Sequence, residues 1–211
     1  MVLMLFMFLL ISCSSSYDED SISGYGTGKI GDQHWMTENL NVNASGSKCY
    51  DNNEAYCAKY GRLYNWATAM ALPDSCNHEN CISKVLPKHR GICPSGWHIP
   101  SDAEWKVLSD SIGGSSIAGK HLKATSGWYH CGKGDSQYKC EDTYGFSALP
   151  GGIGYPVGTF SFAGERGFWW SASEYRNEDA YNRDLSYNSE AAGWFNYEAK
   201  SHFLSVRCVR D

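Results

Sequence analysis

Nine cysteines behind a short apolar N-terminus constrain the fold of this chain more than any other feature. The N-terminal run Met1–Ser12 carries no charge and is too short to cross a bilayer as a helix, which needs roughly 20 residues. It is typical of the apolar region of a secretory signal peptide, so we assign residues 1–12 to one. Cysteines of exported proteins are commonly oxidised in pairs, and an even number of them predicts a disulfide framework.

Cys13 stands apart from the other cysteines because it directly follows the apolar run. Leu10–Cys13 resembles a lipobox, so we expect Cys13 to carry a lipid at the mature N-terminus and leave eight cysteines for disulfides. No Lys or Arg precedes the apolar run, and an ordinary signal peptide with a chance cysteine is the alternative. Residues 13–24 are mostly polar and partly acidic, which predicts a flexible tether. The protein is expected to be exported and lipid-anchored at the outer membrane or cell surface.

The rest of the chain, residues 25–211, is expected to form one domain. The protein has 211 residues, of which 42% are hydrophobic and 14% aromatic, which is enough for one sizeable core. No internal repeat and no linker beyond the tether divides it. A net charge of -5 argues against the basic stripe that nucleic-acid binding needs, so we expect no nucleic-acid partner.

The best-defined element is a helix near the middle of the chain. Ser101 and Glu104 have the spacing of a capping box, in which each side chain accepts a hydrogen bond from the other residue's backbone amide. Apolar residues follow at helical spacing: Trp105, Leu108 and Ile112. Gly113–Gly114 can end the helix in a left-handed conformation. We therefore predict a helix over Asp102–Ile112 with one buried face.

Periodicity predicts a second helix and several strands. Apolar residues at helical spacing precede Pro73 and predict a helix over 60–71: Tyr60, Leu63, Tyr64, Ala67, Met70 and Ala71. A short turn is expected at Ala118–Lys123, and the Trp169–Trp170 doublet is assigned to the core. Strand-like runs are Thr27–Ile30, His34–Met36, Phe168–Ser171, Tyr181–Tyr187, Trp194–Tyr197 and Phe203–Val209. Two main helices ahead of a strand-rich C-terminal half predict an α+β fold.

The segment around the central helix also resembles a known family. Cys93–Trp105 reads Cys-Pro-x-Gly-Trp-His-Ile-Pro-x-Asp-x-Glu-Trp and resembles the central motif of the Fibrobacter succinogenes major paralogous domain, found in exported bacterial proteins, many of them lipoproteins. Further blocks follow the family's order: Lys29–Val42, Tyr60–Met70, Leu122–Trp128, Tyr144–Gly152, Trp169–Glu174 and Ser205–Asp211. More distantly, Trp97–Trp105 and the terminal Arg-Cys-Val-Arg are similar to proteins of C-type-lectin-like fold. The resemblance implies a disulfide-stapled, C-type-lectin-like domain.

The family's pattern, together with proximity in the sequence, implies four disulfides. The pairs are Cys49 with Cys57, Cys76 with Cys81, Cys131 with Cys140, and Cys93 with Cys208. Zinc is the rival for Cys76 and Cys81, because His78 and His89 lie nearby in the sequence. Their spacing fits no common zinc pattern and an oxidising compartment favours disulfides, so we expect no metal site.

Catalytic motifs are absent from the sequence. We find no His-Glu-x-x-His, no Gly-x-Ser-x-Gly and no Gly-rich loop for phosphate or dinucleotide binding. Resemblance to the formylglycine-generating enzymes of C-type-lectin-like fold implies a reactive cysteine pair in the late, strand-rich half, but Glu141–Arg207 contains no cysteine. We therefore expect a protein that is not an enzyme and needs no cofactor, with a cysteine oxidase of this class as an alternative.

Aromatic and polar residues in turn-rich segments favour a binding function. Aromatic rings stack on sugar rings, and amide or carboxylate side chains hydrogen-bond to hydroxyl groups. The candidate ligand-binding residues are Trp128, Tyr129, Asn182, Asp184, Tyr187, Trp194 and Tyr197. For each aromatic residue, ordinary packing is the alternative. The Trp-Asn-Asp block of calcium-dependent lectins is absent, so we expect any sugar binding to be calcium-independent or to use a different loop.

Together these features favour an envelope lipoprotein whose domain binds a polysaccharide or an envelope protein. The family's association with plant-fibre-degrading bacteria implies adhesion to cellulose or a related glycan. A purely structural role as an envelope scaffold is the alternative, because every candidate aromatic residue could serve packing alone.

Overall fold

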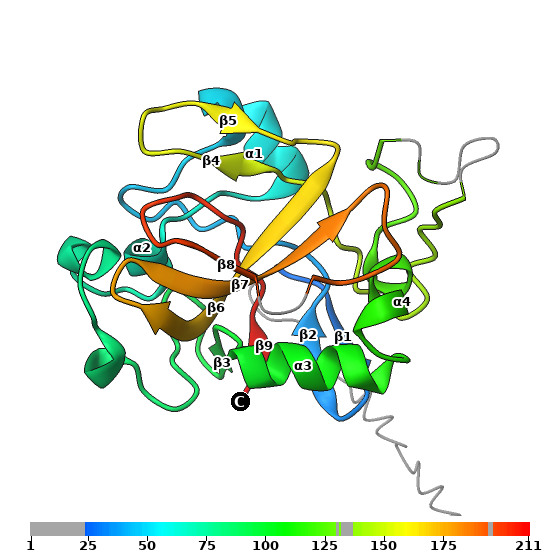
Figure 1. Ribbon diagram of the computed structural model, residues 1–211, viewed down its shortest axis with the longest axis horizontal. Coiled ribbons are helices and arrows are strands. Elements are labelled where there is room, and N and C mark those ends of the chain that lie inside the picture. Colours follow the sequence, from blue (N-terminus) through cyan, green and yellow to red (C-terminus); the bar gives the residue numbers. More distant parts are fainter. Residues whose placement is uncertain (1–23, 130, 132–136, 194–195) are drawn as a thin grey trace, which may run out of the picture.

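The computed structural model describes residues 24–129, 131, 137–193 and 196–211 (Figure 1). The expected signal peptide, Cys13 and almost all of the expected tether lie outside these residues. Within the described part of the chain, no helix has the length and apolar character that crossing a membrane requires.

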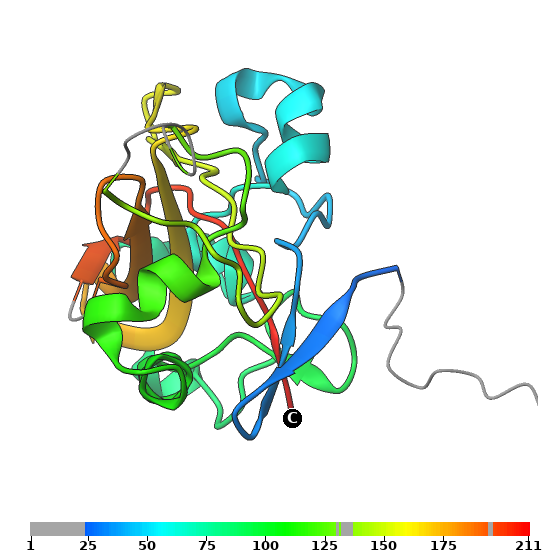
Figure 2. The same cartoon turned by 90° about the vertical axis from the view of Figure 1, so that its right-hand side faces the viewer.

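The strands form three antiparallel sheets. One sheet has four strands in the order β1-β2-β9-β3, one has the order β6-β7-β8, and β4 pairs with β5. The C-terminal strand β9 thus runs beside the N-terminal β1–β2 hairpin (Figure 2). The strands are β1 (Thr27–Ile30), β2 (Gln33–Met36), β3 (Trp97–His98), β4 (Ile153–Gly154), β5 (Phe160–Ser161), β6 (Arg166–Arg176), β7 (Asp179–Ser186), β8 (Asn196–Ala199) and β9 (Val209–Arg210).

The helices precede most of the strands along the chain, so the described residues have the expected α+β arrangement. The α-helices are α1 (Glu54–Tyr60), α2 (Trp66–Ala69), α3 (Asp102–Ser111) and α4 (Ser115–Leu122), and the 3-10 helices are η1 (Tyr50–Asn52), η2 (Asp74–Asn77) and η3 (Ile82–Lys84). The short turn expected at Ala118–Lys123 is instead the second half of α4. In Figure 1, α3 runs along one side of the molecule, where it contacts β6 and β7.

Helix α3 confirms the predicted capping box. The Ser101 hydroxyl accepts a hydrogen bond from Glu104 N (3.3 Å), and the Glu104 carboxylate accepts one from Ser101 N (2.9 Å). At the other end, Gly113 and Gly114 have φ angles of 102° and 91°. Only glycine adopts these angles at little cost, which explains where the helix stops.

The single helix predicted over residues 60–71 is wrong. The chain instead forms α1 and α2 on either side of an extended segment. Gly61 follows the end of α1 with a φ of 78°, and the Asn65 side chain accepts a hydrogen bond from Thr68 N (2.8 Å) at the start of α2. An asparagine in this position is a favourable N-cap, so each helix has its own boundary signal.

The extended segment between α1 and α2 is held by strand-like pairs with distant residues. Leu63 and Lys48 exchange two backbone hydrogen bonds of 2.9 Å. Tyr64 and Leu204 exchange two more, at 2.8 and 3.0 Å. The apolar residues that suggested a helix are therefore buried by tertiary pairing.

Strand β6 separates two hydrophobic clusters. Trp169 belongs to the cluster that contains Trp105, and Trp170 belongs to the cluster that contains Trp66. Because consecutive residues of a strand point to opposite faces, the doublet supplies one large ring to each side of the sheet. Both rings are buried, which confirms their assignment to the core.

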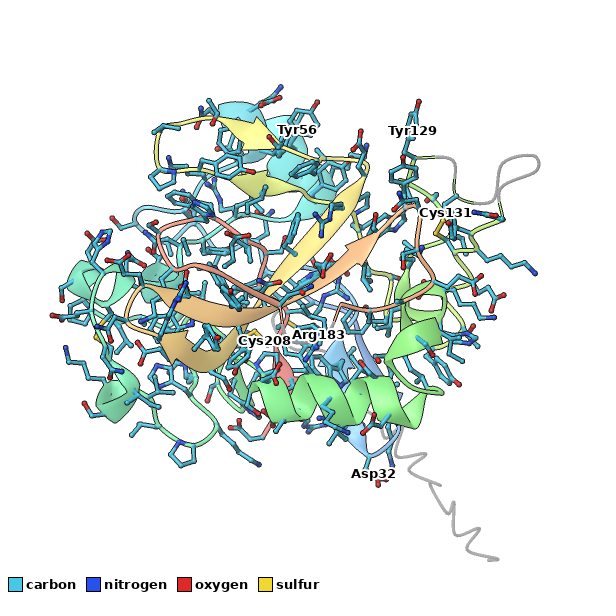
Figure 3. All side chains as sticks on the ribbon, viewed as in Figure 1. Asp32, Tyr56, Tyr129, Cys131, Arg183 and Cys208 are labelled. Carbon is cyan, nitrogen blue, oxygen red and sulfur yellow. A yellow bond between two sulfur atoms is a disulfide. The ribbon has the colours of Figure 1, made fainter. Side chains whose placement is uncertain are left out.

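Four disulfides cross-link the described residues, and they are the expected pairs. Cys49 bonds to Cys57, Cys76 to Cys81, Cys93 to Cys208, and Cys131 to Cys140. The bond to Cys208 spans 115 residues of sequence and ties the segment before β3 to the C-terminal end (Figure 3).

Arg207 is completely buried in the interior of the protein. Its guanidinium donates hydrogen bonds to Asn39 Oδ1 (2.7 and 3.2 Å), Met36 O (3.3 Å), Ser147 O (3.4 Å) and Phe146 O, and lies 4.4 Å from the centre of the Phe146 ring. Burial lowers the pKa of Arg207 to about 9, so the group stays protonated at neutral pH. One side chain thus holds together three segments that are distant in sequence.

His98 on β3 lies between two carboxylates. Its Nδ1 lies 2.7 Å from Asp211 Oδ1 and its Nε2 lies 2.8 Å from Glu104 Oε1, and only 1% of the side chain is exposed. Burial lowers the pKa of His98, but the hydrogen bonds to Glu104 and Asp211 outweigh it and the pKa is raised. Burial raises the pKa of Glu104, whereas hydrogen bonds from His98 and Ser101 outweigh it and lower that pKa to about 2.

The charged His98 is expected to stabilise the protein in a pH-dependent way. Because its pKa is higher in the folded protein than its ordinary 6.5, its contribution is complete below that pH and is lost as the pH rises through the folded value. The destabilisation caused by His98→Gln should therefore be largest below pH 6.5 and should shrink as the pH rises above it. Urea unfolding of both proteins across this range measures it. A difference in unfolding free energy that stays constant would contradict a charged His98.

Candidate ligand-binding site

A cavity of about 430 Å³ is lined by residues of β4, its flanks and one face of the β6–β7–β8 sheet. This volume lies in the range of roughly 300 to 1,000 Å³ that is usual for small-molecule sites. The sheet contributes Arg166, Phe168, Asn182, Asp184, Asn196 and Glu198, and the hairpin and its flanks contribute Ile153, Tyr155 and Phe162.

Strand register explains why polar residues gather on this face. Phe168 is opposite Asp184 in the β6–β7 pair, and Asn182 is opposite Asn196 in the β7–β8 pair. Side chains at every second position share a face, so Asn182 and Asp184 point the same way. Strands β7 and β8 thereby bring two amides and a carboxylate to one wall of the cavity.

Asp184 is the centre of a hydrogen-bond network in this wall. Arg166 Nη2 donates to Asp184 Oδ2 at 2.5 Å, and Asn196 Nδ2 donates to Asp184 Oδ1. Behind the carboxylate, Gly193 N donates to Asp184 O at 2.8 Å, and a Cβ on Gly193 would lie 1.9 Å from Asp184 Oδ1. Both carboxylate oxygens are thus engaged, in a space that only glycine leaves open.

Aromatic rings surround the Arg166 guanidinium. It lies 4.7 Å from the ring centre of Phe168 and 5.8 Å from that of Phe162. Phe162 has a φ of 70°, a left-handed conformation that costs a bulky residue roughly 1 to 2 kcal/mol. Strain of this kind is concentrated at functional sites, because the surrounding structure has to maintain it.

Glu198, which the sheet contributes to the cavity, has a histidine as its partner. Glu198 Oε1 lies 2.9 Å from His202 Nδ1, and the His202 ring meets the Tyr155 ring edge to face at 5.0 Å between centres. Glu198 therefore already has a partner, as Asp184 does.

Two polar atoms of cavity-lining residues are buried without a hydrogen-bond partner among the described residues. They are Asn182 Oδ1 and Arg166 Nε. Asn182 is 2% exposed. A buried polar group without a partner costs about 1 to 3 kcal/mol, so the two atoms, which are closed to solvent, are a local cost of the fold at this wall.

A family model describes the chain from one end of the described fold to the other. The model of the Fibrobacter succinogenes major domain matches residues 29–210. The chain belongs to this family. Comparison with curated proteins and with solved structures finds no match. Membership confirms the resemblance and carries no information about a ligand.

Three of the predicted ligand-binding residues of this Fibrobacter succinogenes major domain line the cavity: Asn182, Asp184 and Tyr197. Tyr197 differs from the other two. It is opposite Tyr181 in the register and one residue from Asn196, so its side chain projects to the other face of the sheet. There it stacks on Tyr175 with ring centres 4.3 Å apart. Asn182 and Asp184 thus remain the predicted residues whose side chains face the cavity.

Trp128 does not line this cavity and packs in the core cluster that contains Trp105. Only 4% of it is exposed, and its Nε1 donates to Ala148 O at 2.9 Å. Its neighbour Tyr129 is 56% exposed and meets Tyr187 edge to face, away from the sheet (Figure 3). Tyr129 and Tyr187 do not line the cavity described here. Trp194 lies outside the described residues.

The cysteines considered for zinc are bonded to each other. Cys76 pairs with Cys81, and the two ring nitrogens of His89 contact Leu86 N (3.1 Å) and Met70 O (2.7 Å). Thiols in a disulfide are not available as metal ligands in this oxidised form.

The sequence interpretation missed Arg166, Asn196 and the two phenylalanines of the cavity. Polar residues at every second position of the strand run 181–187 were a visible signal for Asn182 and Asp184. Arg166 and Asn196 had no such signal, because only the pairing of β6 and β8 with β7 brings them beside Asp184.

Proposed function

We propose that this Fibrobacter succinogenes major domain is a non-enzymatic binding module that is exported, anchored by lipid at Cys13, and used to contact a polysaccharide or another component of the cell surface. The cavity between β4–β5 and β6–β7–β8 is the proposed contact site. The observation that carries this proposal is the cavity lining, in which the rings of Phe162 and Phe168 lie beside the Arg166–Asp184–Asn196 network.

The disulfides support the proposed location and fold. Four disulfides in one chain are typical of proteins that mature in an oxidising compartment outside the cytosol. The likeness of Trp97–Trp105 to C-type-lectin-like proteins supports a fold of that type, in which two helices accompany a strand-rich half. Lipid attachment rests on the sequence Leu10–Cys13 alone.

The chemistry of the cavity supports binding over catalysis. Of the described residues, those lining the cavity include no cysteine, serine or histidine that could act as a nucleophile or base. Its carboxylates, Asp184 and Glu198, are both engaged by neighbouring side chains.

A structural role as an envelope scaffold is the second candidate. Ile82 and Leu86 are 60% and 66% exposed and border an apolar groove that also includes Ile99. Exposed apolar side chains that cluster in this way are common at protein contacts.

Binding to polysaccharide should depend on the cavity. We expect the protein to sediment with insoluble cellulose or xylan, or to bind a glycan array, and Phe162→Ala to weaken this binding about tenfold through loss of the ring at the cavity. Tyr144→Ala is the matched control, because Phe162 and Tyr144 are 40% and 42% exposed and Tyr144 contacts α4 instead.

Both variants are first checked for folding by circular dichroism. Equal loss in the two variants would contradict the proposed site. If the protein binds no glycan but retains a protein from a cell-envelope extract, the scaffold function is favoured.

A further inference from the structure

We propose that an apolar groove beside residues 82–90, here called the basic loop, binds a partner protein through a short acidic segment that carries an apolar side chain. The apolar side chain enters the groove, and the acidic groups face the cations of the basic loop. This inference is independent of the polysaccharide contact at the cavity described above. It rests on the scaffold role and gives that role a partner of defined chemistry.

The first argument is the apolar surface that the groove leaves in contact with water. The groove has a volume of about 430 Å³ and is lined by the basic loop, the start of α3 and part of β6. Its apolar lining residues are Ile82, Val85, Leu86, Pro87, Ile99 and Ala172. Ile82 and Leu86 are 60% and 66% exposed. Removing such side chains from water is favourable, and clusters of them are common at protein contacts.

The second argument is that the basic loop is held in place. Disulfides lie just before it and just after it, at Cys81 and Cys93. Within the loop, His89 Nδ1 accepts a hydrogen bond from Leu86 N at 3.1 Å, and His89 Nε2 donates one to Met70 O at 2.7 Å. A preformed surface loses little conformational freedom on binding, so these exposed side chains suit a specific contact.

The third argument is the charge of the basic loop. The loop contains Lys84, Lys88 and Arg90 and no Asp or Glu, although the net charge of the whole chain is -5. Lys84 Nζ lies 3.8 Å from Glu79 Oε1. Lys88 and Arg90 are both exposed, and neither forms a salt bridge with another of the described residues. Complementary charge guides association and selects partners, so this loop favours an acidic segment.

The two carboxylates of the groove lining are already bound to basic neighbours. Glu174 is 2% exposed and accepts hydrogen bonds from Lys200 Nζ and from Cys81 N, the latter at 2.9 Å. The side chain of Glu104 is 27% exposed, and its Oε1 lies 2.8 Å from His98 Nε2. Among the charged groups of the groove lining and the basic loop, the most exposed are therefore cations.

The shape of the groove favours a peptide segment over an anionic membrane surface. Ile82 and Leu86 are exposed at its rim, whereas Ile99 and Ala172, in the same lining, are 1% and 5% exposed. A bilayer surface contacts only protruding residues, whereas a single side chain can enter between rim and floor. Insertion of an apolar anchor into such a pocket is a recurring mode of peptide recognition.

Selection from a phage library of random short peptides, with the full chain and its disulfides intact, tests this proposal. We expect the selected peptides to combine several Asp or Glu residues with a Leu, Ile, Met or Phe. Their affinity, measured by calorimetric titration, should fall as salt is added, because salt screens the attraction between exposed charges. Leu86→Ser should weaken binding about tenfold, and Lys88→Gln/Arg90→Gln about fivefold.

Val157→Ser and Lys29→Gln/Lys139→Gln are the matched controls. Val157 is 84% exposed, Lys29 and Lys139 are exposed, and none of the three lines the groove. These variants should keep the affinity within about twofold. All the substituted side chains are exposed, and circular dichroism checks that each variant is folded.

The proposal is wrong if no selected peptide depends on Leu86 and Lys88, or if the selected peptides carry no acidic residue. It is also wrong if no peptide binds and the basic-loop variants instead weaken binding to phosphatidylglycerol vesicles or convert a dimer into monomers. The occupant is then an anionic membrane or a second copy of the chain. Absence of peptide binding with glycan binding intact removes this inference alone, whereas the reverse result removes only the polysaccharide contact.

Discussion

Removal of the disulfide between Cys93 and Cys208, as C93A/C208A, is expected to lower the free energy of unfolding by about 4 to 5 kcal/mol. The two residues are 115 apart in sequence, and a cross-link restricts the unfolded chain more strongly as the loop it closes grows longer. Both sulfur atoms are also buried in the cluster around Trp66, so the folded state loses packing. Guanidinium unfolding followed by tryptophan fluorescence measures the loss.

The disulfide between Cys49 and Cys57 provides the matched control. These cysteines are also buried, but they are only 8 residues apart. The same chain-entropy relation predicts that C49A/C57A loses about 2.5 kcal/mol. Equal losses in the two double variants would show that loop length is not what makes the longer bridge important.

Replacement of Arg207 by methionine is expected to cost about 3 to 5 kcal/mol of unfolding free energy. Methionine fills much of the same volume but donates no hydrogen bond, so Asn39 Oδ1 and the carbonyl oxygens of Met36, Phe146 and Ser147 lose their contacts with the guanidinium. Arg207→Lys keeps the charge but offers three donors on a single nitrogen, which cannot reproduce the planar fork. Its free energy of unfolding should therefore lie between that of Arg207→Met and that of the unaltered protein.

Arg176→Met is the control for the loss of a surface arginine. The side chain of Arg176 is 64% exposed, pairs with Asp179 and lies 5.6 and 5.4 Å from the ring centres of Tyr175 and Tyr197, so its removal should cost much less stability than removal of the buried Arg207. Urea unfolding of the variants gives the comparison. If Arg207→Met were as stable as the unaltered protein, the buried guanidinium would not be a stabilising link between Asn39 and Phe146.

Local sequence signals predicted the elements whose boundaries depend on near neighbours. The start of α3 at Asp102 follows from Ser101 and Glu104, whose mutual hydrogen bonds span three residues. Its end follows from two glycines with positive φ angles. Interactions of this range form in the same way in most tertiary contexts, which is why a sequence pattern can identify them.

The segment from Gly61 to Asn65 shows where the same approach failed. Apolar spacing there suits a helix, yet Leu63 and Tyr64 are extended because Lys48 and Leu204 supply their backbone partners. Periodicity records only which residues are buried. Apolar spacing does not distinguish a segment buried as a helix from an extended segment that is paired with residues distant in the sequence.

For the candidate site, the sequence identified Asn182 and Asp184 as polar residues of one strand, but not their partners. Arg166 and Asn196 reach Asp184 only through the register of three strands, and a shift of one residue would turn each side chain to the other face. Trp128 shows the converse, since an aromatic residue in a turn-rich segment proved to be buried against Ala148.

The sequence by itself determined the disulfide-rich α+β character of this protein, its central capped helix and its family, because these depend on residue identity, cysteine parity and spacing within a few positions. Only the tertiary structure decided that Arg207 is a buried link, that His98 lies between two carboxylates, and that a cavity forms with Asn182 unpartnered. The physical reason is that these environments are made by residues distant in sequence or on other strands: Asp211 lies 113 positions from His98, Asn39 lies 168 positions from Arg207, and the cavity wall depends on the register of three strands.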